Sequence, residues 1–85
     1  MAANNLEVAL RFFDSTRSTI AQLAKMPGIG SPYSGNNSRL QELRKWAVKG
    51  FRKYLIFYFE RDDAIEVIRI LYATQNVSSI LEGEV

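Results

Sequence analysis

The chain contains no cysteine and no histidine among its 85 residues. Without cysteine it has no disulfide framework, no thiolate nucleophile and no thiolate ligand for a metal. Without histidine it also lacks the commonest general base and the commonest metal ligand of proteins. A serine hydrolase triad and a structural zinc site are therefore not expected, and we predict neither a metal nor a cofactor.

Long apolar runs are also missing. No stretch of about 18 apolar residues is present to span a membrane, and the polar start MAANN is not a signal peptide. We therefore expect a cytoplasmic protein without a membrane partner. With 47% hydrophobic and 24% charged residues, the chain is too apolar for intrinsic disorder, and its length suits a single domain over residues 1–85. The net charge of +2 does not by itself indicate nucleic acid.

The first part of the chain has helical periodicity. Residues Leu6 to Met26 are predicted to form one amphipathic helix, which Pro27 ends because proline cannot continue it. The apolar residues that recur at three- and four-residue spacing form one stripe: Leu6, Leu10, Phe13, Ile20, Leu23 and Ala24.

The rest of the chain is predicted to be mainly β. Residues 27–38 (PGIGSPYSGNNS) have the composition of a loop. Strands are expected over 40–48, 53–60 and 65–73, and their short connections favour an antiparallel meander. A short helix over 77–81 closes the chain. The fold class is α+β, with helix packed on a small three-stranded sheet.

The middle strand, Lys53 to Glu60, is apolar on both faces. One long helix can cover only one face of a three-stranded sheet. The second face therefore needs the C-terminal helix, a second copy of the chain, or a partner protein. This pattern favours an interaction protein over a catalyst.

Positive charge is concentrated between residues 39 and 53, where Glu42 is the one acid. The basic residues are Arg39, Arg44, Lys45, Lys49, Arg52 and Lys53, with Trp46, Phe51 and Tyr54 between them. Such a segment could contact RNA phosphates and stack on bases, or receive an acidic partner. It could equally be a solvated hairpin edge on which charge discourages aggregation.

Arg69 lies in the apolar segment IEVIRILYA, and we assign it to the same strand face as Val67 and Leu71. A charge in that setting is paired, extends to solvent, or belongs to a site. A salt bridge to Glu42 or Glu60 and an exposed functional arginine are both compatible with the pattern. We predict no catalytic residue, since tyrosines in strands are usually packing residues. The candidate contacts for a target or a partner protein are Arg44, Lys45, Trp46, Lys49, Arg52, Lys53 and Arg69.

Two segments, FFDSTRSTIAQLAKMPGIGSPY and LRKWAVKGFRKYLIFYFERDDAIEVIRILYATQN, carry three motifs in register. These are the helix exit "LA..P..G", the strand "Y.IFY" starting at Tyr54, and the strand "I.VIRIL" starting at Ile65. Together they resemble the ParE branch of the RelE/ParE superfamily of type II toxin–antitoxin toxins.

The resemblance implies a helical hairpin on a twisted antiparallel sheet, and a ParD-like antitoxin whose C-terminal segment covers apolar surface. ParE toxins inhibit DNA gyrase and serve plasmid or chromosome stabilisation, whereas RelE-type relatives cleave mRNA on the ribosome. Family members usually begin with a strand and a helix before the helix seen here. We therefore expect an N-terminally short member in which both elements are missing.

Residues at the positions of nuclease side chains differ from those of RelE-type relatives. Leu55 and Gln75 stand where such relatives carry arginine, and no tyrosine follows Tyr72, which stands where ParE-like chains often have histidine. Without those cations, phosphate cleavage lacks electrostatic stabilisation. The resemblance thus favours a non-enzymatic gyrase inhibitor neutralised by an antitoxin. The alternatives are a ribosome-dependent mRNA endonuclease using Arg44, Lys45, Lys53 and Arg69, and an inactive antitoxin-binding relic. A homodimer and a hetero-oligomer are both left open.

Overall fold

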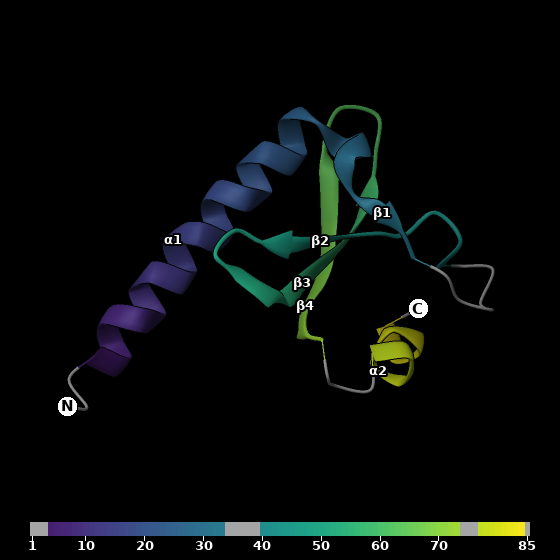
Figure 1. The fold of residues 1–85 in the computed structure, drawn as a ribbon. Helices are drawn as coiled ribbons and strands as arrows, with labels where there is room; N and C mark the ends of the chain where they lie inside the picture. The colour runs from purple at the N-terminus through teal and green to yellow at the C-terminus, as the bar shows by residue number, and fades with distance from the viewer. Residues whose placement is uncertain (1–3, 34–39, 74–76, 85) are drawn as a thin grey trace.

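The computed structural model describes residues 4–33, 40–73 and 77–84. It has an α+β fold in which two helices lie on opposite sides of one antiparallel sheet (Figure 1). In chain order the elements are α1 (Asn4–Lys25), the 3₁₀ turn η1 (Pro27–Ile29), β1 (Ser31–Pro32), β2 (Arg44–Val48), β3 (Phe51–Glu60), β4 (Ile65–Tyr72) and α2 (Val77–Glu84).

The sheet is an antiparallel meander with strand order β1-β2-β3-β4. The predicted meander is confirmed, but the count of three strands was wrong, because β1 forms within the segment assigned to a loop and pairs with Arg44 and Lys45. The first predicted strand also begins four residues later than expected. Leu43 donates its N–H to the carbonyl of Leu40, so this part of the chain turns before it extends.

A two-residue turn, Lys49–Gly50, joins β2 to β3, and Val48 lies opposite Phe51. Gly50 has a φ of 80°, in the left-handed region that side chains with a Cβ rarely adopt. Glycine at this position therefore permits the tight hairpin that carries much of the basic segment.

The register between β3 and β4 shifts by one residue. Arg69 lies opposite Phe57, whereas Val67 lies opposite Tyr58, so β4 has one extra residue, Ile68, at a β-bulge. Because Phe57 and Tyr58 point to opposite faces, Arg69 and Val67 do so too. The assignment of Arg69 to the same face as Val67 was wrong, since a strict two-residue alternation ignores the bulge.

The core is divided between the two faces of the sheet. On the α1 face the buried residues are Leu23, Val48, Ile56 and Tyr58. On the α2 face they are Leu40, Leu43, Phe57, Phe59, Leu71 and Leu81. The central strand is thus buried on both sides. The second face is covered by α2, the C-terminal helix, which was one of the three alternatives expected from the sequence.

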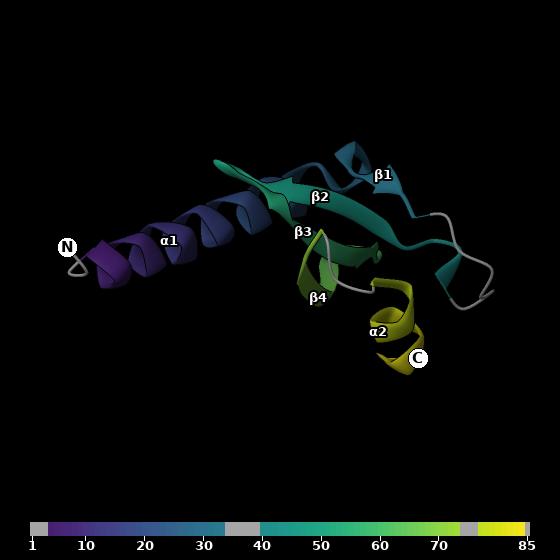
Figure 2. The same cartoon turned by 60° about the horizontal axis from the view of Figure 1, so that its bottom comes forward.

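Packing of α1 on the sheet begins at Phe12, whose ring lies against Phe51 and Tyr54 of β3. Leu23 is buried and Ile20 half-buried, but Leu6, Leu10 and Phe13 are 69%, 55% and 59% exposed. Of the predicted apolar stripe, Ile20 and Leu23 are therefore covered by the sheet, whereas Leu6, Leu10 and Phe13 are not. The sheet ends before the helix does, and Figure 2 shows the N-terminal half of α1 extending beyond it.

The described helices include none whose length and apolar character would let it cross a membrane.

Candidate functional site

The segment after α1 is fixed to the sheet by one buried side chain. The Tyr58 hydroxyl accepts a hydrogen bond from the N–H of Gly30 at 3.1 Å and donates one to the carbonyl of Pro27 at 2.6 Å. Burial raises the pKa of Tyr58 above its ordinary value of 10.0, and the Gly30 hydrogen bond and the Arg44 charge oppose that rise. The phenol is therefore a neutral structural group.

Gly30 is required for steric reasons. A Cβ on this residue would lie 2.9 Å from Cζ of Tyr58, closer than side-chain atoms approach one another. Its φ of −69° is ordinary, so close approach of the ring is what excludes a larger residue. This contact explains physically why "P..G" in the helix exit and the second tyrosine of "Y.IFY" occur together.

Arg44, one of the candidate contact residues, completes this attachment. Its guanidinium donates to the carbonyls of Gly30 at 2.6 Å and Gly28 at 3.4 Å, and it forms an ion pair with Glu60 at 4.0 Å. These contacts hold the half-buried side chain against the helix-exit segment. We therefore assign Arg44 a structural role.

Three of the other candidate residues meet at the β2–β3 hairpin. An apolar groove of about 350 Å³ lies there and is lined mainly by carbon atoms. We call it the hairpin groove; its lining residues are Gln22, Trp46, Ala47, Val48, Lys49, Gly50 and Arg52. Gln22 was missed by sequence reasoning, because nothing in the helical pattern shows which polar residue faces a hairpin brought close by folding.

The hairpin is held against α1 by Thr19. The N–H of Lys49 donates to the Thr19 hydroxyl at 3.1 Å, and that hydroxyl donates to the carbonyl of Ser15 at 2.7 Å. Thr19 is only 2% exposed, so this contact lies in the interface between helix and hairpin. It fixes the position of the basic turn relative to the helix wall of the hairpin groove.

The remaining candidates lie on the α2 face. Lys45 on β2 and Arg69 on β4 are both opposite Phe57 on β3, so the two cations flank this ring on one face. Strand alternation places Lys53 on the same face, beside Leu55. Phe57 is 1% exposed, which excludes stacking of a nucleic-acid base on its ring.

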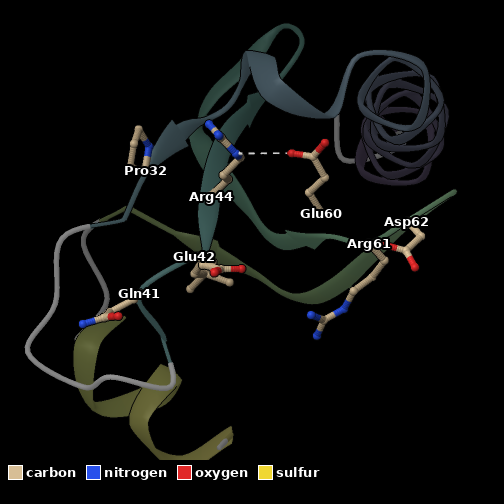
Figure 3. A pocket seen from close by; sticks show the side chains of 8 residues that line it. Pro32, Gln41, Glu42, Arg44, Glu60, Arg61 and Asp62 are labelled. Carbon is tan, nitrogen blue, oxygen red and sulfur yellow. Dashed lines mark ion pairs between the residues drawn. The ribbon is translucent and has the colours of Figure 1, made fainter.

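A polar pocket of about 600 Å³ lies at the other end of β3 and is shown in Figure 3. Its charged lining residues are Glu42, Arg44, Glu60, Arg61 and Asp62. Arg44 points toward Glu60, and Arg61 forms two hydrogen bonds with Glu66, at 2.9 and 2.7 Å. Both cations are thus engaged, and the pocket has no charge excess that would select an anionic ligand.

The same geometry bears on the expected salt bridge of Arg69. Glu60 is paired with Arg44 and lies opposite Ile65, on the Tyr58 face of β3. Arg69 lies on the Phe57 face. The sheet therefore separates Arg69 from Glu60, and Glu60 as its partner was wrong.

Tyr72 and the cations Lys45 and Arg69 lie on opposite faces of the sheet. Tyr72 lies opposite Tyr54, with their ring centroids 5.0 Å apart, on the face that packs against Phe12 of α1. Lys45 and Arg69 are on the other face. Within the described ranges no group of three or more acidic residues could hold a metal ion. Gln75, which replaces an expected arginine, lies outside the described residues.

Comparison with known proteins agrees with the motifs. The family model of the ParE toxin of type II toxin–antitoxin system, parDE, matches residues 1–77. No curated protein and no solved structure matches the chain significantly. The matched region includes α1, the helix-exit attachment, the hairpin groove and the whole sheet. The chain is therefore a member of the ParE family, a toxin of a type II toxin–antitoxin system.

Proposed function

We propose that the chain inhibits DNA gyrase by binding it, and that a cognate ParD-like antitoxin neutralises the inhibition. The observation that carries this proposal is the separation of potential catalytic groups. Tyr72 is on the α1 face, whereas Lys45 and Arg69 are on the α2 face. A phosphate held by these two cations would therefore be out of reach of the tyrosine, so binding is favoured over cleavage.

The hairpin groove is the surface that we propose for the antitoxin. It combines the half-buried apolar side chains of Trp46 and Ala47 with the exposed cations of Lys49 and Arg52. An amphipathic segment with an apolar anchor and neighbouring acidic residues is complementary to such a groove. Because the charges are exposed, we expect salt to slow association more than it accelerates dissociation. Association rates unchanged by salt would contradict this assignment.

The second candidate is a ribosome-dependent endoribonuclease, since three cations gather on the α2 face. Against it, Leu55 is half-buried in the apolar cluster where a nuclease relative would have arginine. Without that charge, the three cations Lys45, Lys53 and Arg69 alone would have to stabilise the pentavalent phosphate. Primer extension on translated mRNA, with and without Arg69→Ala, tests this alternative; no cleavage by either protein eliminates it.

Gyrase supercoiling is the direct test of the first proposal. The purified chain should inhibit supercoiling at about stoichiometric ratio, and adding the antitoxin should reverse the inhibition. Normal supercoiling with excess folded toxin would overturn gyrase as the target. Normal growth of bacteria expressing the chain without an antitoxin would instead favour an inactive antitoxin-binding relic.

Two variants test the hairpin groove separately from the target. Arg52→Glu reverses a charge at the groove, and Lys53→Glu makes the same change on the other face of the strand. Antitoxin binding should weaken by about tenfold or more for Arg52→Glu and by less than about threefold for Lys53→Glu. Equal losses would show that the antitoxin does not distinguish the two faces.

A further inference from the structure

The outer edge of β2 is paired along only part of its length. The neighbouring strand β1 has two residues, and these pair with Lys45 and Arg44. In the part of the chain that the structure describes, no strand lies beside the rest of β2 on that side. The chain leaves this edge at Gly30, which Tyr58 holds on the α1 face of the sheet. β2 therefore extends past the end of its neighbour, and such an edge can accept another strand.

The direction of the backbone groups identifies Ala47 as the open position. In an antiparallel ladder, the N–H and C=O of one residue point to the same side, and those of the next residue point to the other side. The carbonyl of Leu43 accepts a hydrogen bond from the N–H of Tyr33 at 2.8 Å, so the odd-numbered residues of β2 face β1. Lys45 is paired there with Ser31, and Ala47 is the next residue that faces this way. Its N–H and C=O thus point to the open edge.

The register on the other side of β2 agrees with this direction. Ala47 lies opposite Leu55 of β3, and Leu55 lies opposite Leu71 of β4. The N–H of Ala73 donates to the carbonyl of Lys53 at 2.6 Å, so residues 53 and 55 direct their backbone groups to β4. Leu55 therefore does not take up the backbone groups of Ala47, which remain for a strand on the outer side.

The hairpin groove lies along this same edge. Ala47 lines it together with Trp46, Lys49 and Arg52. The next backbone donor in the outward direction, the N–H of Lys49, is bonded to the hydroxyl of Thr19 at 3.1 Å. The open edge is thus short, with β1 at one end and α1 at the other, and it has apolar surface and exposed cations beside it.

We propose that the antitoxin segment in the hairpin groove binds as a β-strand that extends the sheet at Ala47; this rests on the proposed function in placing the antitoxin there. The strand accepts a hydrogen bond from the N–H of Ala47 and donates one to its C=O. Its residue opposite Ala47 projects to the face of Lys45, where a carboxylate is complementary. The residues on either side of it project to the face of Trp46, where apolar side chains pack. The segment therefore alternates acidic and apolar residues.

Charge selects an acidic partner strand over a second copy of this chain. Two β2 edges paired about a two-fold axis at Ala47 would place Lys45 of one copy opposite Lys49 of the other. Like charges directly opposite each other across strands are destabilising. Residues 44–50 (RKWAVKG) contain no acid that would offset this repulsion. An acidic strand instead meets cations on both faces of the edge.

Amide hydrogen exchange of the toxin, free and bound to its cognate antitoxin, tests the pairing. The Ala47 amide should exchange about 100-fold or more slowly in the complex than in the free toxin. The amide of Lys45, which is already paired with Ser31, should change much less. A helical segment bonds its own backbone groups internally, so tight binding without slower exchange at Ala47 would overturn the proposal. Exchange at Ala47 that slows as the concentration of toxin alone rises would assign the edge to a second copy, and this too would overturn it.

Ala47→Pro tests the outward N–H directly. Proline removes this donor, which takes no part in the β2–β3 ladder, and antitoxin binding should weaken by about tenfold or more. Ala64→Pro is the matched control, because it makes the same change in atoms at the exposed turn between β3 and β4. It should weaken binding by less than about threefold, and circular dichroism verifies that both variants fold. Equal losses from the two variants would contradict the role of the Ala47 donor.

Failure of this inference is distinguishable from failure of the proposed function. Gyrase supercoiling does not involve the edge of β2, so a different target of the toxin leaves the strand pairing unaffected. Weaker antitoxin binding by Arg52→Glu, together with unchanged exchange at Ala47, would place the antitoxin in the hairpin groove but overturn its strand conformation.

Discussion

On the α1 face of the sheet, hydrogen bonds that involve the side chains of Tyr58, Arg44 and Thr19 join segments far apart in sequence. On the α2 face, the attachment of the helix rests on Leu81, which is completely buried with five other buried apolar residues. Hydrogen bonds are directional and specify how α1 and its exit segment sit on the sheet. Apolar burial is non-directional and contributes mainly stability. The two faces therefore should respond differently to mutation.

The largest effect is expected on the α2 face, from Leu81→Ala. The buried side chain loses its apolar contacts and leaves a cavity, which lowers the free energy of unfolding by about 2–5 kcal/mol. Urea denaturation followed by circular dichroism measures the change. The smaller end of this range would indicate that the neighbouring side chains collapse into the space, or that α2 unfolds locally before the sheet.

Among substitutions on the α1 face, Gly30→Ala should lower the free energy of unfolding the most. The new methyl group would collide with the ring of Tyr58, so the exit segment moves and both hydrogen bonds of the phenol weaken. We expect a loss of about 2–4 kcal/mol from overpacking and from the unsatisfied buried groups. Combining it with Tyr58→Phe should cost less than the sum of the two single changes, because they disrupt the same contact. Additive losses would show that the steric contact and the hydrogen bonds are independent.

Tyr58→Phe removes the hydroxyl and keeps the ring. The N–H of Gly30 and the carbonyl of Pro27 lose their partner, at a cost of about 1–3 kcal/mol at neutral pH. Burial raises the pKa of Tyr58 in the folded state above 10.0, so the folded protein retains the phenol proton where the unfolded chain releases it. In the wild-type chain, the contribution of Tyr58 to the free energy of unfolding is fully present below pH 10 and decreases above pH 10. The difference in free energy of unfolding between the wild-type chain and Tyr58→Phe, measured by urea titration, should therefore become smaller above pH 10. A difference that does not change with pH would contradict the raised pKa of Tyr58.

The segments with a strong single pattern were predictable from sequence. Periodicity identified α1 and the central strand, and the doubly apolar residues 56–59 are buried as expected. The bulge at Ile68 was not predictable, because one inserted residue changes the face of Arg69 without changing local composition. Burial of α1 was only half predictable, since the periodicity cannot show where the sheet beneath the helix ends.

The residues proposed as contacts were predictable in type, but their arrangement was not. Sequence reasoning found Trp46, Lys49 and Arg52, which line the hairpin groove. It could not separate them from Lys45 and Lys53, because the face of a residue depends on the register between strands. It proposed Arg44 as a contact residue but could not show that this guanidinium donates to carbonyls of the helix exit.

Thr19→Val should have a moderate effect on the α1 face. Valine fills nearly the same volume but cannot accept the hydrogen bond of Lys49, so a partly buried N–H loses its partner. We expect a loss of about 0.5–1.5 kcal/mol in the free energy of unfolding. Hydrogen exchange of the Lys49 amide should accelerate more than that of amides in the middle of β3. Unchanged exchange at Lys49 would indicate that this hydrogen bond does not hold the hairpin to the helix.

Thr16→Val, one turn earlier on the same helix face, should have the smallest effect and the opposite sign. Thr16 is 8% exposed, and its hydroxyl makes no hydrogen bond with any part of the chain that the structure describes. Replacing a buried hydroxyl that lacks a partner removes a desolvation cost, so the stability should rise by about 0.5–1 kcal/mol. The measurement is the urea midpoint of Thr16→Val beside that of Thr19→Val, which has the same change in atoms. Opposite shifts would show that hydrogen bonding, and not the presence of a polar residue, determines stability on the α1 face, whereas equal losses would mean that the Thr16 hydroxyl also contributes a stabilising contact.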